Sequence, residues 1–272
     1  MSDWPNTLVL AGAGKMGGAM LKGWLAGGLP AAGVAVIEPH PSTELALLAA
    51  RHGFRLNPAE GERNPPEALI LAVKPQMLES AAKKLADLAG ADTLVVSVVA
   101  GKTIANLAAR LPARAFVRVM PNTPAAVGRG ASAGAANVTV SSMQRAWTER
   151  LMRAVGLFEW VDDEALIDAV TALSGSGPAY AFSLVEAMAK AGETLGLSAD
   201  LAMRLARATV EGAGELMYQE PDISATQLRI NVTSPGGTTA AALAVLQAPD
   251  GLNPLLARAI AAAHRRAGEL AG

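Results

Sequence analysis

The sequence predicts an α/β protein in which a doubly wound parallel sheet is followed by an all-helical domain. Short, continuously apolar runs alternate with helix-compatible stretches through the first half of the chain, a pattern typical of a parallel sheet covered by helices. After residue 162 the strand signals stop, and the remaining residues favour helices. At 272 residues the chain also exceeds the usual length of a single domain. We therefore expect two domains, over residues 1–162 and 163–272.

The first predicted strand ends in a glycine-rich turn. Residues 8–11 are continuously apolar, as in a strand buried on both faces, and residues 15–25 favour a helix. Between them, Gly12, Gly14 and Gly17 form the pattern G-x-G-x-x-G. There the first glycine permits a tight turn, the second lets a pyrophosphate approach the backbone, and the third lets the helix pack on the strand. The stretch predicts a dinucleotide site at a helix N-terminus, and a glycine-rich turn of another α/β protein is the alternative.

Glu38 closes the second predicted strand, residues 34–37. It follows Gly17 by roughly the 20 residues that separate the glycine loop from the acidic residue of a dinucleotide site. A carboxylate at that position accepts hydrogen bonds from the adenosine ribose hydroxyls, favours NAD and repels a 2′-phosphate. The alternative is an ordinary solvated charge at a strand end, and the sequence leaves both interpretations open.

The rest of the first domain continues the alternation of helix and strand. Helices are expected over residues 43–52, 76–88, 104–110 and from Ser141 or Ser142 to 154, and strands over 54–56, 68–73, 93–98, 115–119 and 157–161. Polar side chains stand at the carboxyl ends of several strands, namely Lys74, Ser97, Asn122 and Thr123. Ligands of doubly wound sheets gather beyond those ends, so we expect these residues to form a polar rim over a cofactor cleft.

The second domain is predicted to consist of helices over residues 164–173, 178–195, 198–218, 240–247 and 251–270. Glycine and alanine are frequent at 189–196 and 212–214, inside two of these helices. Because a glycine inside a helix costs about 1 kcal/mol relative to alanine, their presence favours close helix–helix contacts. Hydrophobic residues make up 51% of the chain, and we expect helix packing between subunits to bury part of that excess.

Residues 232–239 have the unusual sequence VTSPGGTT and lead into a predicted helix. Ser234 is expected to cap that helix, while Pro235 and the two glycines keep the turn open. The first N–H groups of the helix would then point outward beside the hydroxyls of Thr238 and Thr239. This arrangement predicts a receptor for a small carboxylate without a cationic side chain. A helix start that is only well capped is the alternative, but Pro-Gly-Gly exceeds what capping needs.

The composition argues against several classes of function. Lys and Arg total 23 against 24 Asp and Glu, and no run of basic residues favours nucleic-acid binding. The chain has no cysteine, which excludes disulfides, thiolate catalysis and cysteine-bound zinc, and we expect no metal site. The longest uncharged stretch, between Arg229 and Asp250, is interrupted by polar residues and Pro-Gly-Gly, so we expect no membrane span. We see no signal peptide and expect a cytoplasmic protein.

Five motifs occur in the order in which they are found in pyrroline-5-carboxylate reductases, a family that the chain resembles over nearly its whole length. They are GAGKMG at 12–17, AVKP at 72–75, MPNTP at 120–124, SGSGPAY at 174–180 and SPGGTT at 234–239. The resemblance implies reduction of Δ1-pyrroline-5-carboxylate to L-proline with NADPH or NADH, the last step of proline synthesis. It also implies a Rossmann domain and a helical domain that interlocks with a partner's in a homodimer, which can assemble into larger rings.

The resemblance further implies roles for individual residues. The cofactor would be bound by Gly12, Gly14, Lys15, Met16, Gly17, Asn57, Ala72, Val73, Lys74, Pro75, Ala100 and Asn122, together with Glu38, which its spacing from the glycine loop predicts. The substrate carboxylate would be bound by Ser234, Gly236, Gly237 and Thr238. Thr239 matches the family's hydroxyl that hydrogen-bonds the ring nitrogen, and it is the expected catalytic residue. Many members have serine or threonine in place of Glu38, so the preference between NADPH and NADH stays open. The family also often has an acidic residue in place of Ile230, so that position cannot have an essential charge.

Two other functions remain as alternatives on the sequence. A β-hydroxyacid dehydrogenase shares the two-domain layout but requires a lysine base on the helix after the linker, where Lys190 is the sole lysine. A nucleotide-sensing protein without turnover would not need the carboxylate receptor. The three histidines, His40, His52 and His264, are expected at the surface, and none is assigned to catalysis.

Overall fold

The computed structural model describes residues 4–59 and 64–271 and divides the chain into two compact units. The sheet unit comprises the chain up to Gly175 together with the residues from Ala263 onward. The helical unit comprises Ser176–Ala262. The expected domain boundary at 162–163 falls inside the sheet unit, a short helix and a turn before its first segment ends.

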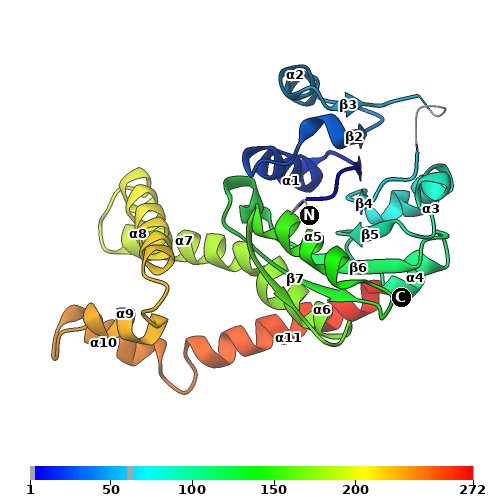
Figure 1. Cartoon of the computed structure of the whole chain (residues 1–272). Coiled ribbons are helices and arrows are strands. Elements are labelled where there is room, and N and C mark those ends of the chain that lie inside the picture. The colour runs from blue at the N-terminus through cyan, green and yellow to red at the C-terminus, as the bar shows by residue number, and fades with distance from the viewer. Residues whose placement is uncertain (1–3, 60–63, 272) are drawn as a thin grey trace. The chain divides into compact units, whose positions relative to one another are not determined.

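Within the described residues, an eight-stranded sheet runs in the order β3-β2-β1-β4-β5-β6-β7-β8 (Figure 1). The strands are β1 (Leu8–Ala11), β2 (Val34–Ile37), β3 (Arg55–Leu56), β4 (Ala68–Leu71), β5 (Leu94–Ser97), β6 (Ala115–Met120), β7 (Gly130–Ala136) and β8 (Gly156–Trp160). Neighbouring strands pair in parallel, except that β6 and β7 are antiparallel. The chain builds outward from β1 in both directions, so the predicted doubly wound fold class is confirmed.

Alternate residues of the inner strands face two hydrophobic cores. The helices of the sheet unit are α1 (Lys15–Ala26), α2 (Thr43–His52), α3 (Leu78–Leu85), α4 (Ile104–Ala108), α5 (Ser142–Arg153) and α6 (Leu166–Val170). Leu8 and Leu10 of β1 face the core formed with α1, α2 and α5, whereas Val9 and Ala11 face the core formed with α3 and α4. Because both faces are covered, every position of β1 must be apolar, which explains the continuous run in the sequence.

Strand β7 was missed by the sequence interpretation because its sequence, GASAGAA, lacks the β-branched and aromatic residues typical of strands. Small residues are required there: a Cβ on Gly134 would lie 2.9 Å from the ring of Phe158 on β8. The helix expected over 164–173 is also different. Only α6 is α-helical, and it continues into a π-helical turn, Thr171–Gly175.

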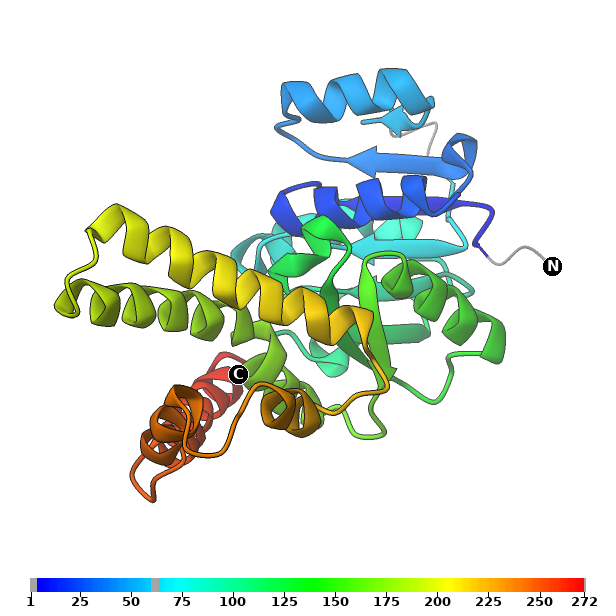
Figure 2. The same ribbon diagram turned by 90° about the vertical axis from the view of Figure 1, so that its left-hand side faces the viewer.

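The helical unit contains α7 (Gly177–Thr194), α8 (Ala199–Gln219), α9 (Ala225–Asn231), α10 (Thr238–Leu246) and the first part of α11 (Leu252–Ala271). Figure 2 shows α7 and α8 side by side. Small side chains fill their contact, with Ala189, Ala202 and Ala206 buried, and a Cβ on Gly192 would lie 3.2 Å from the Cβ of Ala202. The predicted close helix packing is therefore present at Ala189 and Gly192, but a Cβ on Gly196, Gly212 or Gly214 would meet no atom of the described chain within 4 Å. Across the described part of the chain, no helix combines the length and apolarity that a membrane span requires.

The last turns of α11, from Ala263, belong to the sheet unit. They pack on the loop that follows β5, where Gly101 has a φ of +67°. A Cβ on Gly101 would lie 2.8 Å from the carbonyl oxygen of Leu270, so only glycine fits beneath the helix. The sheet unit is thus assembled from two segments of chain that are separated by the whole helical unit.

Candidate functional site

Three glycines shape the turn between β1 and α1, and each has different surroundings. Gly12 has a φ of +92°, and a Cβ there would lie 2.6 Å from the carbonyl oxygen of Ala72. A Cβ on Gly17 would lie 2.1 Å from the carbonyl oxygen of Gly12, so glycine alone lets the helix start this close to the strand. Gly14 has open space where its Cβ would be. The turn therefore leaves its backbone accessible to a ligand at Gly14.

Helix α1 begins at Lys15, and its N-cap, Gly14, provides no side-chain cap. The N–H groups of Lys15, Met16 and Gly17 have no acceptor within the helix, because they belong to its first turn. They also mark the positive end of the helix dipole, which attracts phosphate. Lys15 is exposed and Met16 is half-buried. This end of α1 is therefore suited to an anionic ligand.

Glu38 lies against the glycine loop. Its Oε2 accepts a hydrogen bond from the N–H of Ala13 at 2.9 Å, and its Oε1 accepts one from the N–H of His40 at 3.1 Å. Asn57 holds the main chain of Glu38 from the other side, accepting from its N–H and donating to its carbonyl oxygen, each at 2.8 Å. Asn57 itself has a φ of +50°. The carboxylate at the end of β2 is thus fixed beside the predicted dinucleotide loop.

The other cofactor residues expected from the sequence lie at the same edge of the sheet. Strands β1, β4, β5 and β6 are neighbours and run parallel, so their carboxyl ends lie together. Residues 72–75 follow β4, Ala100 follows β5 and Asn122 follows β6. Lys74 and Ala100 are exposed, whereas the neighbours of Lys74 are half-buried. The structure therefore brings the glycine loop and these three segments to one edge.

Asn122 is buried, and both the oxygen and the nitrogen of its side-chain amide form hydrogen bonds. Its Oδ1 accepts from the N–H of Ala131, near the start of β7, at 2.8 Å. Its Nδ2 donates to the carbonyl oxygen of Ser174, in the π-helical turn, at 3.1 Å. Asn122 therefore joins β6, β7 and that turn, a structural contact that the sequence interpretation did not foresee. One amide hydrogen of its Nδ2 remains for another acceptor.

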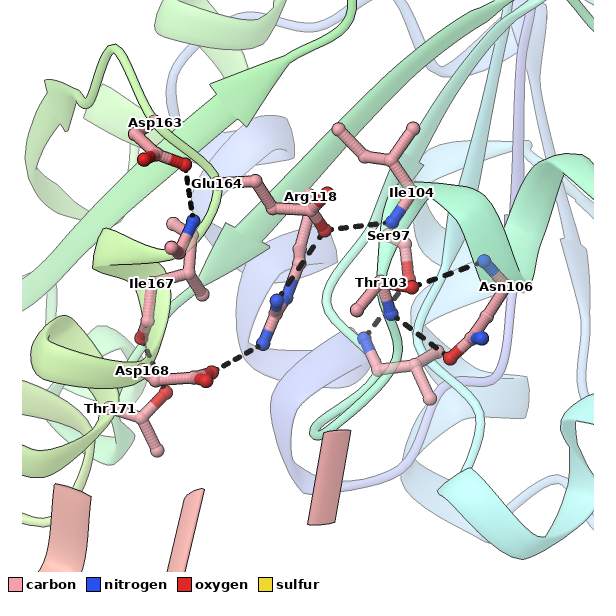
Figure 3. Close-up of polar contacts among 12 residues, drawn as sticks. Ser97, Thr103, Ile104, Asn106, Arg118, Asp163, Glu164, Ile167, Asp168 and Thr171 are labelled. Carbon is pink, nitrogen blue, oxygen red and sulfur yellow. Dashed lines mark hydrogen bonds and ion pairs between the residues drawn. The ribbon is translucent and has the colours of Figure 1, made fainter. Parts of the chain in front are cut away.

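A buried ion-pair network ties β6 to α6 and α4, and Figure 3 shows it. Arg118 of β6 is 5% exposed. Its guanidinium pairs with Glu164 Oε1 at 3.4 Å and with Asp168 Oδ1 at 3.0 Å. The same Glu164 oxygen accepts from the N–H of Ile104, at the start of α4, at 2.7 Å. The sequence interpretation missed this network, although an arginine inside the apolar run 115–119 was its signal.

The turn before α10 leaves a helix N-terminus open in the helical unit. The N-cap is Gly237, without a side-chain cap, and the helix starts at Thr238. The expectation that Ser234 caps the helix is wrong: its carbonyl oxygen accepts from the N–H of Gly237 at 3.0 Å, closing a turn in which Gly236 has a φ of +69°. Thr238 and Thr239 therefore lie in the first turn, with N–H groups suited to bind a small anion.

The residues that other chemistries would require are placed differently. Lys190 is exposed, and its Nζ pairs with Glu193 Oε2 of the same helix at 2.9 Å. The three histidines, His40, His52 and His264, are exposed, as expected. Within residues 4–59 and 64–271, no three His, Asp or Glu side chains are grouped so that they could hold a metal ion.

Two family models match the chain. Residues 7–101 match a family described as NADP oxidoreductase coenzyme F420-dependent. Residues 164–270 match one described as pyrroline-5-carboxylate reductase dimerisation. The first match covers the glycine loop and the second covers the helical unit, together with the last part of the sheet unit.

The similar proteins share one description, and each matches this chain over most of its length. Pyrroline-5-carboxylate reductase of Pseudomonas aeruginosa is 41% identical over 266 residues, covering 97% of this chain and 96% of that protein. The enzyme of Synechocystis is 42% identical over 240 residues, covering 87% of each. A pyrroline-5-carboxylate reductase structure from Coxiella burnetii matches with a TM-score of 0.90 at 36% identity, covering 98% of this chain and 99% of that one.

A Plasmodium falciparum pyrroline carboxylate reductase solved with NADP bound matches with a TM-score of 0.79 at 26% identity, covering 98% of each chain. Identity above 40% across 97% of the chain leaves little room for a different family. The glycine loop, the open start of α10 and these full-length relatives lead to one conclusion: the chain is an oxidoreductase that belongs to the pyrroline-5-carboxylate reductase family.

Proposed function

We propose that the chain reduces Δ1-pyrroline-5-carboxylate to L-proline with NADH or NADPH, the last step of proline synthesis. The observation that carries the proposal is that a member of this family has two helix N-termini without a side-chain cap. One begins α1 beside the glycine loop, and the other begins α10 after the Pro-Gly-Gly turn. The first suits a diphosphate and the second suits a small carboxylate.

The sheet unit holds the cofactor in this proposal. The N–H groups at the start of α1 bind the diphosphate, and Glu38 and Asn57 border the adenosine ribose. Residues 72–75, Ala100 and Asn122 line the path toward the nicotinamide, since they follow β4, β5 and β6, which succeed β1 in the sheet. When bound, the reduced nicotinamide supplies the hydride, two electrons with one hydrogen nucleus, that the imine carbon accepts.

The start of α10 holds the substrate in this proposal. The substrate carboxylate accepts from the N–H groups of Gly237 and Thr238, with the Ser234 hydroxyl and the Gly236 backbone beside it. The Thr239 hydroxyl hydrogen-bonds the ring nitrogen. As hydride adds to the carbon, the electron pair of the C=N π bond moves to that nitrogen, which already carries its proton. A protonated imine is electrophilic by itself, so the protein's task is placement.

The assembly that we propose is an interlocked homodimer, able to form larger rings, in the cytoplasm. The match of residues 164–270 to a dimerisation family supports self-association. The proposed second domain, residues 163–272, starts one residue before that match. Many large apolar side chains of α7 and α8 are exposed in the single chain, and a partner's helices would cover them.

Incubating the purified chain with pyrroline-5-carboxylate tests the function. We expect the nicotinamide absorbance to fall with NADH or NADPH and proline to accumulate in equal amount. The absence of oxidation with both cofactors would contradict the proposal and favour a nucleotide sensor. Oxidation of β-hydroxyacids is not expected, because Lys190, the base that it would need, is paired with Glu193 at the surface.

A further inference from the structure

We infer that the chain selects NADH over NADPH, and that Asn57 is the positioning residue that makes Glu38 the selecting group. The inference rests on the proposed function, because it takes the glycine loop as the site of the adenosine half of the cofactor. It departs from the NADP named by the matching family model and bound in the Plasmodium relative.

The carboxylate of Glu38 is held in place on both oxygens. One accepts from the N–H of Ala13 inside the glycine loop, and the other accepts from the N–H of His40. Each oxygen has a further lone pair, so the group still accepts two more hydrogen bonds. The 2′- and 3′-hydroxyls of a ribose are two such donors. A carboxylate already fixed at the loop binds them with little additional loss of side-chain entropy.

Asn57 sets the position from which Glu38 reaches the loop. Its side-chain amide forms a pair of hydrogen bonds with the N–H and carbonyl oxygen of Glu38, both 2.8 Å long. Asn57 takes a left-handed conformation, φ +50°, which is uncommon outside glycine but tolerated by asparagine. The Asn57 N–H donates to the carbonyl oxygen of Val36 at 2.8 Å. The residue thus connects the end of β3 to the end of β2 and fixes the backbone of Glu38.

The segment after β2 offers little to a 2′-phosphate. Pro39 and Pro41 have no N–H, and the N–H of His40 is donated to Glu38. The Ser42 hydroxyl caps α2 by accepting from the N–H of Leu45, and its O–H remains a donor. Within residues 38–42, the His40 imidazole is the one side chain able to carry positive charge. A 2′-phosphate there would face the fixed Glu38 carboxylate, and this like-charge repulsion disfavours NADPH.

Direct binding to the purified full chain tests the selection without any imine substrate. Calorimetric titration gives the Kd of NADH and of NADPH, and steady-state kinetics gives KM and kcat for each. We expect wild type to bind NADH at least about tenfold more tightly. Glu38→Ser, which removes the charge, should bring the two Kd values within roughly threefold or reverse their order. Glu38→Asp, which keeps the charge, should retain the preference for NADH.

Asn57→Gly tests the positioning role. Glycine adopts φ +50° without strain, so this variant removes the amide pair and leaves the backbone conformation available. The KM for NADH should rise severalfold with kcat unchanged, and the preference for NADH should fall. Gln144→Ala is the matched control, since the Gln144 side-chain amide also accepts from a main-chain N–H, that of Ser141 in the capping box of α5, far from residues 38 and 57 in the sequence. It should leave the preference at the wild-type value.

Two results would overturn the inference. Wild type that binds NADPH as tightly as NADH would show that Glu38 does not select. If Glu38→Ser changes the preference for NADH over NADPH but Asn57→Gly does not, Asn57 does not position Glu38 for this selection. A chain that binds NADH selectively but does not reduce pyrroline-5-carboxylate would contradict the proposed function and leave the selection standing.

Discussion

Gly17 has the least room for a side chain in the glycine loop, while Gly14 has the most. A methyl group at Gly17 would lie 2.1 Å from the backbone oxygen of Gly12, but one at Gly14 would meet no atom within 4 Å. The two positions therefore separate a structural requirement from a binding requirement. Substitution with alanine, which adds a single carbon at each position, distinguishes the two requirements.

Gly17→Ala should lower the free energy of unfolding by about 1–3 kcal/mol, the usual effect of overpacking, and abolish cofactor binding. Gly14→Ala should leave the free energy of unfolding within about 0.5 kcal/mol of wild type and still weaken NADH binding. Urea denaturation measures the free energy of unfolding of each variant, and calorimetric titration measures its affinity for NADH. Gly14→Ala with unchanged NADH affinity would mean that no ligand approaches the backbone there.

Thr239→Ala should reduce kcat roughly tenfold, because a hydrogen bond to a charged ring nitrogen is lost. Its free energy of unfolding should be close to that of wild type, since Thr239 is only half-buried at a helix start. Thr239→Ser keeps the hydroxyl and is the matched control, with kcat near the wild-type value. Equal kcat and KM in wild type and Thr239→Ala would remove this residue from the reaction.

Single residues were predictable from the sequence where local spacing determines their surroundings. The tasks of Gly12 and Gly17 followed from their places in the motif: Gly12 has the positive φ of a tight turn, and Gly17 lies as close to its neighbours as expected. The contact of Glu38 with Ala13 was not predictable, because it requires two strand ends to be neighbours in space. Asn57 entered through the family resemblance alone, and its amide pair with Glu38 became visible only in the fold.

At the scale of elements, the Arg118 network joins three of them and bears on stability. Arg118 is buried, and the side chains of Glu164 and Asp168 are largely shielded. Removing the arginine would leave two acidic groups without their partner in a poorly solvated place. The network therefore matters more to the stability of the sheet unit than the exposed ion pairs on α8 do.

Arg118→Met should lower the free energy of unfolding by about 3 kcal/mol, measured by urea denaturation. Arg207→Met is the control, because Arg207 pairs with Glu211 on an exposed helix face, where an ion pair adds little to stability. Adding Asp168→Asn to Arg118→Met should recover part of the loss, since one uncompensated charge is removed. Equal stability of the two methionine variants would contradict a structural role for the network.

Elements were predictable where the sequence has a continuous apolar run or a helical pattern long enough to recognise. The inner strands β1, β4 and β5 and the long helices α7 and α8 appear where they were expected. Strand β7 and the π-helical turn were not, because one is made of small residues and the other depends on contacts from Asn122. The start of α10 was displaced because the Ser234–Gly237 turn, and not a serine cap, precedes it.

At the scale of the whole molecule, the helical unit has a small core within the single chain and exposes large apolar side chains. Its buried core consists of alanines, whereas side chains such as Phe182 and Leu205 are 65% and 51% exposed. Sequence composition had indicated this excess of apolar residues but not which faces carry it. The division of the chain into a sheet unit and a helical unit was predictable from the sequence. The return of α11 to the sheet unit was not, because helix periodicity does not reveal a packing partner.

Leu205→Glu should shift the chain from dimer toward monomer, because it places a charge on an apolar surface that a partner helix would cover. Sedimentation velocity measures the change. Leu47→Glu on α2 is the control, since Leu47 is 66% exposed in the sheet unit and should leave the assembly unchanged. A Leu205→Glu chain that remains dimeric at micromolar concentration would place the interface on another face.

The contact between Leu270 and Gly101 has a consequence for the order of biosynthesis. A ribosome finishes all of residues 176–262 before it makes the turns that cover the loop after β5. The loop after β5 in the newly made sheet unit is therefore not yet covered by α11 while the helices of residues 176–262 are being synthesised and folding. A polypeptide truncated before residue 263 would therefore have a sheet unit whose loop after β5 is uncovered. A synthetic peptide of residues 263–271, added separately, is expected to bind to that loop and complete the unit.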